Sequence, residues 1–205
     1  MYFSGPWSVV YALDARTGRL LWKYDPEVAG QWARTACCDV VNRGVALWEG
    51  RVYVASLDGY LIALDAKTGE QTWVFNTVPD SGQAADTWTR KSETNPPTGG
   101  ALWTSFSLDP ANGVLYVPTG NVAPDFAAAL HPGESLYTSC ILALDARSGA
   151  LLGYVQPVKN DFHDWDMAAA PAIVQTRGGR QMALAGGKDG LLYGRGAADM
   201  KGGLA

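Results

Sequence analysis

The sequence Ala12-Leu13-Asp14-Ala15-Arg16-Thr17-Gly18-Arg19-Leu20-Leu21-Trp22 decides the fold, because two similar sequences follow it in the same chain. The second copy runs from Ala63 to Trp73, and the third begins at Ala143 and has Gly153 at the position of the tryptophan. Each copy predicts a strand, a tight turn and a second strand. The aspartate can hold the turn through the local backbone, and the glycine supplies a positive φ.

The spacing of the copies predicts the architecture. The first two begin 51 residues apart, at positions 12 and 63, close to the ~40–50 residues of a four-stranded propeller blade. Positions 80–98 and 122–136 are polar and rich in glycine and proline, which predicts two long loops before and after a weaker turn at 108–113. The sequence therefore predicts an all-β fold made of β-propeller blades, with about four blades in one domain over residues 1–205.

Composition supports this fold class and excludes several functions. Hydrophobic residues make up 47% of the chain and charged residues 18%, with 24 glycines, 11 prolines and 8 tryptophans, which favours strands and turns over a helical bundle. The net charge is −4 and there is no basic stripe, which argues against a nucleic-acid partner. The sequence has no apolar run of about 18 residues, so it predicts no membrane-spanning helix. No export signal is visible.

Cys37 and Cys38 are adjacent, which is unusual. Neighbouring Cα atoms lie ~3.8 Å apart, below the ~4.4–6.8 Å of ordinary disulfides, so a bond between the two thiols would close a strained ring. The alternative is a pair of small buried residues that happen to be neighbours, and the spacing alone favours it. Cys140 lies in an apolar run and is predicted to be a buried thiol.

The repeat resembles the tryptophan-docking repeat of the pyrroloquinoline quinone (PQQ)-dependent alcohol dehydrogenases, which are eight-bladed propeller enzymes. In that family the run Cys-Cys-Asp-x-Val-Asn-Arg-Gly carries a disulfide between the adjacent cysteines, packed against the cofactor. The resemblance therefore implies cofactor-binding roles for Cys37, Cys38 and Arg43. Trp103 ends a Gly-Gly-Ala-Leu-Trp run that resembles the segment whose tryptophan stacks under the quinone.

Further segments resemble the same family and follow in the same order along the chain. Asn121, in positions 119–124, is similar to the family's calcium-ligating asparagine. Asp166 ends a segment that resembles the one with the catalytic aspartate, which also binds calcium. Lys188 falls where the family has an arginine or lysine near the quinone oxygens. Ala168 stands where lanthanide-using relatives have a further aspartate, and this favours calcium.

These residue types suit the chemistry that the resemblance implies. PQQ is a flat quinone with three carboxylates, so an aromatic plate below it and cations at its rim would bind it. Calcium prefers oxygen ligands and acts as a Lewis acid. Asp166 would take the hydroxyl proton while the α-hydrogen of a primary alcohol leaves as hydride. The family passes the electrons to a cytochrome c and works in the periplasm.

Each of these residues taken alone has a simpler structural explanation, such as a core tryptophan, a turn asparagine or a surface charge. Together they favour an enzyme over the alternatives, which are a non-catalytic propeller used as an envelope scaffold and a truncated product without a settled fold. One departure from the family stands out, since its Gly-Ala-Glu segment with a calcium-binding glutamate is not found between the second repeat and Trp103. This predicts a missing blade. Asp125 and Glu134 are carboxylates that could replace the glutamate, although nothing in their spacing supports either.

Overall fold

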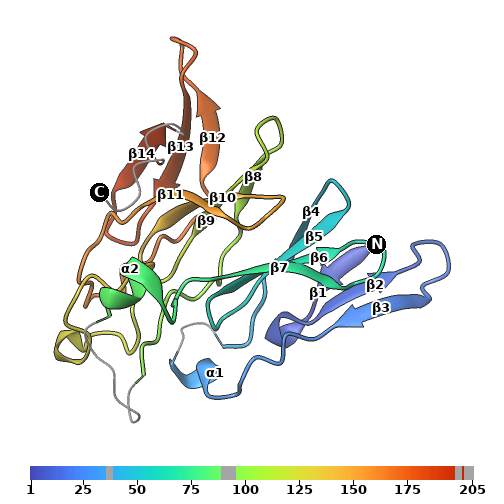
Figure 1. Ribbon diagram of the computed structural model, residues 1–205, viewed down its shortest axis with the longest axis horizontal. Coiled ribbons are helices and arrows are strands. Elements are labelled where there is room, and N and C mark those ends of the chain that lie inside the picture. The colour runs from blue at the N-terminus through green and yellow to red at the C-terminus, as the bar shows by residue number, and fades with distance from the viewer. Residues whose placement is uncertain (36–38, 89–95, 197–199, 201–205) are drawn as a thin grey trace.

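The computed structural model describes residues 1–35, 39–88, 96–196 and 200 (Figure 1). In this part of the chain the strands form four antiparallel sheets that follow one another along the sequence. Two sheets have four strands, and the first and last have three. The predicted all-β architecture of propeller blades is confirmed, and the blades form part of a propeller.

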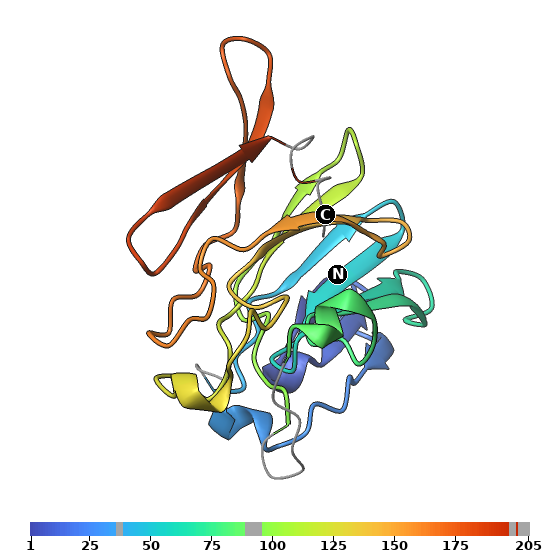
Figure 2. The same ribbon diagram turned by 60° about the vertical axis from the view of Figure 1, so that its left-hand side comes forward.

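The first sheet contains β1 (Tyr2–Ser4), β2 (Val10–Leu13) and β3 (Leu20–Tyr24). The second contains β4 (Val45–Trp48), β5 (Arg51–Ala55), β6 (Tyr60–Asp65) and β7 (Gln71–Asn76). The third contains β8 (Ser107–Asp109), β9 (Val114–Pro118), β10 (Ile141–Asp145) and β11 (Leu151–Val155), and the fourth β12 (Ala172–Gln175), β13 (Gln181–Gly186) and β14 (Leu192–Gly196). The sheets fan out side by side in both ribbon views (Figures 1 and 2).

Short helices lie in the connections between strands. They are α1 (Trp32–Thr35), α2 (Gly82–Asp86) and the 3-10 turns η1 (Pro6–Ser8) and η2 (Ala128–Leu130). The two stretches predicted as loops therefore each hold one short helical turn. Figure 1 shows α1, α2 and the longer connections at the end of the sheets opposite the repeat turns. No helix in the described ranges is long and apolar enough to cross a membrane.

The repeat turns have the geometry that the sequence predicts. In the second repeat, Oδ1 of Asp65 accepts the backbone N–H groups of Lys67 and Thr68, both at 2.8 Å. Gly69 closes the turn with a φ of 79°, a conformation that only glycine adopts without strain. Asp14 and Asp145 hold the other two repeat turns in the same way.

The acid sensitivity of such a turn can be tested. The N–H groups of Thr68 and Lys67 lower the pKa of Asp65 from 3.8, so the carboxylate contributes stability that is complete above the unfolded-state pKa. This contribution is lost as the pH falls through the lower folded-state pKa. Urea unfolding should show Asp65→Asn less stable than the parent at pH 7, with a gap that narrows below pH 4. Asp86→Asn, at an exposed position on α2, should stay within about 0.5 kcal/mol of the parent at pH 7.

Tryptophans within β3 and β7 dock the first sheet on the second and the second on the third. Nε1 of Trp22 donates to the carbonyl of Ala66 at 3.1 Å, and Nε1 of Trp73 donates to that of Ala146 at 3.2 Å. The Trp73 indole covers the repeat glycine of the next blade so closely that a Cβ at Gly149 would lie 2.6 Å from it. The second and third sheets are therefore direct neighbours.

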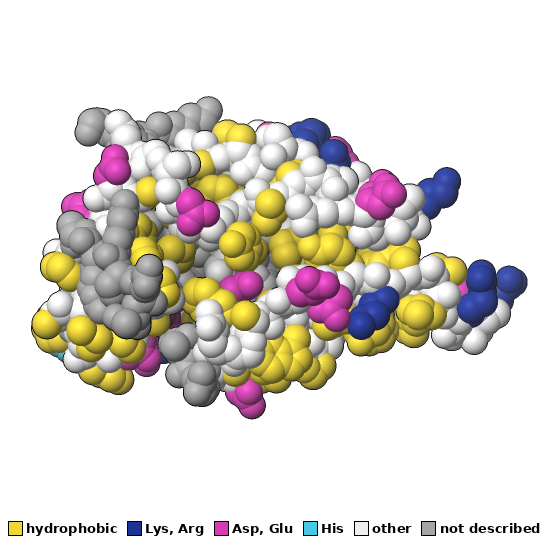
Figure 3. Space-filling model, turned by 60° about the horizontal axis from the view of Figure 1, so that its bottom comes forward, with side chains coloured by type: hydrophobic (Ala, Val, Ile, Leu, Met, Phe, Trp, Pro, Cys, Tyr) yellow, Lys and Arg dark blue, Asp and Glu magenta, His cyan; other side chains and the backbone are white. Residues whose placement is uncertain are grey.

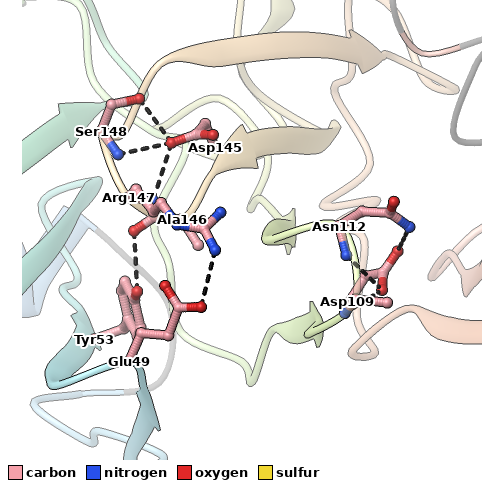
Figure 4. A network of polar contacts seen from close by, with 9 residues as sticks. Glu49, Tyr53, Asp109, Asn112, Asp145, Ala146, Arg147 and Ser148 are labelled. Carbon is pink, nitrogen blue, oxygen red and sulfur yellow. Dashed lines mark hydrogen bonds and ion pairs between the residues drawn. The ribbon is translucent and has the colours of Figure 1, made fainter.

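Polar contacts reinforce this boundary (Figure 4). The Tyr53 hydroxyl also donates to the carbonyl of Ala146, at 2.9 Å, and Arg147 forms an ion pair with Glu49 at 2.8 Å. The guanidinium of Arg147 lies 4.5 Å from the ring centroid of Trp48. These contacts join β4 and β5 to the turn that follows β10.

The main core fills the space between the second and third sheets. Its fully buried side chains include Tyr53, Leu61, Leu115, Leu142 and Leu144. Cys140 belongs to the same cluster with no exposed surface, so the predicted buried thiol is confirmed. Burial raises the pKa of this thiol well above its usual value, which keeps it protonated and unreactive.

Candidate functional site

Two loop segments meet at the end of the sheets that carries the longer connections. Gly99 forms a bridge with Val122, and the N–H of Gly100 donates to the carbonyl of Asn121 at 2.8 Å. Gly99 has a φ of 128°, and a Cβ there would lie 2.5 Å from the Asn121 carbonyl oxygen. The glycine pair therefore allows the close backbone approach that brings the Trp103 segment beside Asn121.

Two cations flank the Trp103 indole. Cζ of Arg43 and Nζ of Lys188 each lie 5.5 Å from its ring centroid. Arg43 also donates from Nε to the Trp103 carbonyl at 3.1 Å. Its neighbour Asn42 is anchored to β5 through a 2.7 Å bond from Nδ2 to the Ala55 carbonyl. The result is an aromatic plate with a positively charged rim.

Asp166 lies at the centre of the site with 1% of its surface exposed. Its Oδ1 accepts the backbone N–H of Asn121 at 2.5 Å. Its Oδ2 lies 2.6 Å from Nζ of Lys188, which also contacts Oδ1 of Asp164 at 2.9 Å. The Lys188–Asp166 contact is an ion pair, and it meets the charge of the buried Oδ2.

The ionisation of this pair follows from burial and charge. Burial raises the pKa of Asp166, while Lys188 and the Asn121 N–H act in the opposite direction. For Lys188, burial acts to lower the pKa, but the carboxylates of Asp166 and Asp164 outweigh it and the pKa is raised. The lysine therefore stays protonated and stabilises the carboxylate form of Asp166.

A structured loop carries Asp166. Both side-chain oxygens of the buried Asp161 accept backbone N–H groups, from His163 at 3.0 Å and from Trp165 at 2.8 Å. The His163 ring stacks on Trp165 with a centroid distance of 4.2 Å and packs tilted against Phe162 at 3.8 Å. His163 thus packs within the loop.

A narrow cavity joins these residues. Its walls include Trp32, Leu57, Trp103, Asn121, Asp125 and Asp166. The cavity volume is about 10 Å³, close to the space of one water molecule, so a quinone would require the walls to separate. A wider cavity of about 350 Å³ is also lined by Trp32, so this residue lies in the walls of both cavities. Figure 3 views the molecule from this end, where hydrophobic and acidic side chains share the face.

The structure brings together five of the seven residues singled out from the sequence: Arg43, Trp103, Asn121, Asp166 and Lys188. Cys37 and Cys38 lie outside the described residues, so their disulfide stays a prediction. Trp32 was not predicted, because a lone tryptophan in a four-residue helix carries no sequence signal. Asp125 was one of two carboxylates considered, and only the fold places it in the cavity.

The donor set fits a hard cation. Within the described ranges no three histidine, cysteine, aspartate or glutamate side chains converge on one point. The cavity nevertheless offers the Asn121 amide oxygen and the buried Oδ2 of Asp166, and oxygen donors of this kind suit calcium. The plate and its cations likewise fit a flat anionic ring.

Comparison with known proteins identifies relatives. The profile of the PQQ family described as "Glucose/ethanol/alcohol dehydrogenase, beta-propeller domain" matches residues 1–72 and 52–194. The quinohemoprotein alcohol dehydrogenase ADH IIB of Pseudomonas putida is 36% identical over 236 residues, covering 84% of this chain and 34% of the relative. The 1-butanol dehydrogenase (cytochrome c) of Thauera butanivorans is 60% identical over 80 residues, which are 39% of this chain and 12% of the relative.

Solved structures agree with this relationship. The quinohemoprotein alcohol dehydrogenase ADHIIG from Pseudomonas putida HK5 superposes with a TM-score of 0.60 at 32% identity, over 98% of this chain and 39% of that one. A europium-containing methanol dehydrogenase gives a TM-score of 0.59 at 22% identity, over 99% of this chain and 48% of that one, which shows the shared fold. This chain spans about a third of the length of the Pseudomonas relatives.

Proposed function

Because this chain belongs to the PQQ β-propeller family of glucose, ethanol and alcohol dehydrogenases, we propose that it forms part of an enzyme that oxidises a primary alcohol to an aldehyde with PQQ and calcium. The observation that carries the proposal is the buried Asp166, held by the Asn121 N–H and Lys188 beside the cation-flanked Trp103 plate. A scaffold has no need of such an arrangement.

Different residues of the site would bind the quinone and the calcium. Trp103 would support one face of the quinone, with Arg43 and Lys188 neutralising its carboxylates and oxygens. Asn121 and Asp166 would hold calcium. When bound, PQQ would supply hydride-accepting chemistry and calcium the Lewis acidity that assists it.

Asp166 would act as the general base. A carboxylate that is kept ionised by Lys188 in a buried site can accept the hydroxyl proton of an alcohol. Burial has raised its pKa, which strengthens it as a base relative to an exposed aspartate.

The electron acceptor and the cellular compartment are proposed from the similarity of this chain to known proteins. The Thauera relative is named as a cytochrome c-linked dehydrogenase and the Pseudomonas relatives as quinohemoproteins. We infer a cytochrome c acceptor on that basis, and a periplasmic location from the family resemblance.

The chain also has the features of an internal blade deletion. The two stretches that match the family profile overlap at residues 52–72, so β5, β6 and the turn after them match two positions of the family. The ADH IIB alignment runs over 236 residues, whereas 84% of 205 residues is about 172, which leaves roughly 64 without a counterpart here. We infer that two blades are fused at their repeats, and that the Trp73 docking seals the junction.

Cofactor binding tests the proposed function. Adding PQQ and Ca²⁺ to the purified chain should shift the quinone absorption and raise the melting temperature, because ligands that bind the folded state stabilise it. Trp103→Ala should weaken PQQ binding about tenfold or more, since aromatic stacking of a planar ring contributes about 1–3 kcal/mol.

The matched control is Trp48→Ala, which removes an indole at the blade boundary and should leave PQQ affinity unchanged. Absence of any shift in the parent at millimolar calcium would remove cofactor binding from the proposal and favour the scaffold alternative. Equal affinities of the parent and Trp103→Ala would instead show that the quinone binds elsewhere.

A further inference from the structure

Asn121 links two carboxylates in the narrow cavity. Its backbone N–H donates to Oδ1 of Asp166 at 2.5 Å, and its side-chain Nδ2 donates to Oδ1 of Asp125 at 2.7 Å. With Nδ2 turned toward Asp125, the amide oxygen is free to face another group. No hydrogen bond recorded between described residues uses that oxygen.

The three residues therefore present oxygens that their mutual hydrogen bonds do not use. These are the Asn121 amide oxygen, the second oxygen of Asp125 and Oδ2 of Asp166, and all three residues line the same cavity. Oδ2 of Asp166 is buried and receives no hydrogen bond. The Lys188 ammonium lies 2.6 Å from it, and an ionised carboxylate oxygen has lone pairs for a further positively charged partner. A divalent cation would be such a partner.

Charge supports a cation at this position. Lys188 contacts Asp166 and Asp164. The carboxylates of Asp164 and Asp161 also act on Asp125, so acidic groups gather at this position. One carboxylate and one amide are a weak set for calcium, which usually takes six to eight oxygens with several carboxylates among them. A second carboxylate from Asp125 would strengthen the set considerably.

The other carboxylate considered from the sequence is engaged elsewhere. Oε1 of Glu134 pairs with Nζ of Lys159 at 2.7 Å on the surface, with 44% of the Glu134 side chain exposed. Glu134 does not line the cavity. The structure therefore separates two candidates that the sequence left equal.

We propose that Asp125 is a metal ligand, which completes an oxygen site for a divalent cation together with Asn121 and Asp166. The proposal rests on the proposed function, because it concerns the same calcium site. It adds a residue to that site, four positions after Asn121, for which a Gly-Asn-x-Ala-Pro segment alone gives no expectation.

Terbium is a suitable probe, because it prefers the same hard oxygen ligands as calcium and its luminescence is excited by nearby indoles such as Trp32 and Trp103. Titration of the full chain with Tb³⁺ should give saturable luminescence that millimolar Ca²⁺ displaces. Asp125→Asn should raise the dissociation constant about tenfold or more, whereas the control Glu134→Gln should change it less than twofold.

The fold of Asp125→Asn is checked separately. Asparagine keeps an oxygen that can accept the Asn121 Nδ2–H bond, so the metal-free melting temperature should match the parent. The rise in melting temperature on adding Ca²⁺ should be present in the parent and in Glu134→Gln and be lost in Asp125→Asn.

The possible outcomes distinguish the role of Asp125 from the existence of the calcium site. Saturable terbium binding that is equal in the parent and Asp125→Asn would overturn the role of Asp125 and leave the calcium site standing. No saturable binding in the parent would overturn both the role of Asp125 and the calcium part of the proposed function. Loss of binding in Glu134→Gln alone would assign the extra carboxylate to Glu134.

Discussion

Gly149→Ala is expected to lower the free energy of unfolding by about 2–5 kcal/mol. The substitution places a Cβ at a φ of 74°, which costs about 1–2 kcal/mol for an L-residue. The same Cβ would lie 2.6 Å from Trp73, and overpacking of this kind costs about 1–3 kcal/mol more. Urea unfolding of the full chain measures the loss.

The chain supplies a matched control for this prediction. Gly18 occupies the same position of the first repeat with the same φ of 74°, and a Cβ there meets nothing within 4 Å. Gly18→Ala should therefore cost only the turn strain, about 1–2 kcal/mol. In a Trp73→Leu background, Gly149→Ala should cost no more than Gly18→Ala does. Equal losses from the two glycine substitutions in the parent would contradict direct docking of the second sheet on the third.

Lys188→Met is expected to cost about 3 kcal/mol at neutral pH, because it leaves the carboxylate of Asp166 buried without its counter-ion. Removing one partner of a buried pair typically costs about 3–5 kcal/mol, and the 30% exposure of Lys188 favours the lower end. The control Lys159→Met breaks an exposed ion pair of 2.7 Å and should cost less than about 1 kcal/mol.

The pH dependence of Lys188→Met has a defined sign. Burial already raises the pKa of Asp166 above 3.8, and loss of the lysine raises it further. A carboxyl group whose folded-state pKa is raised destabilises the protein at neutral pH, and this penalty is relieved as the pH falls through that pKa. The gap between the parent and Lys188→Met should therefore narrow toward acid. A gap that stays constant from pH 7 to pH 4 would contradict the pairing.

Much of the fold is local and could be predicted. An aspartate that bonds the N–H groups two and three residues ahead, together with a glycine in the left-handed region, specifies a turn without any distant contact. The turns around Asp65 and Asp145 therefore appear in the structure as the sequence predicts. The same is true of the weaker turn at Asp109, which joins β8 to β9.

The candidate site was predicted by resemblance rather than by physics, since its residues lie far apart in the chain. Each of these residues is ordinary in isolation. Only the packing of the sheets places the cations of Arg43 and Lys188 beside the indole of Trp103. The narrow cavity and the position of Trp32 in its wall depend on the same packing.

The sequence by itself determined the repeat, its turns and the propeller class, because periodic strands and turn residues act over a few neighbours. The tertiary structure alone decided that Trp73 docks on the turn after β10 and that Asp125, not Glu134, lies beside Asn121 and Asp166. The reason is physical: contacts between residues tens of positions apart depend on how whole sheets pack, and no local pattern records that.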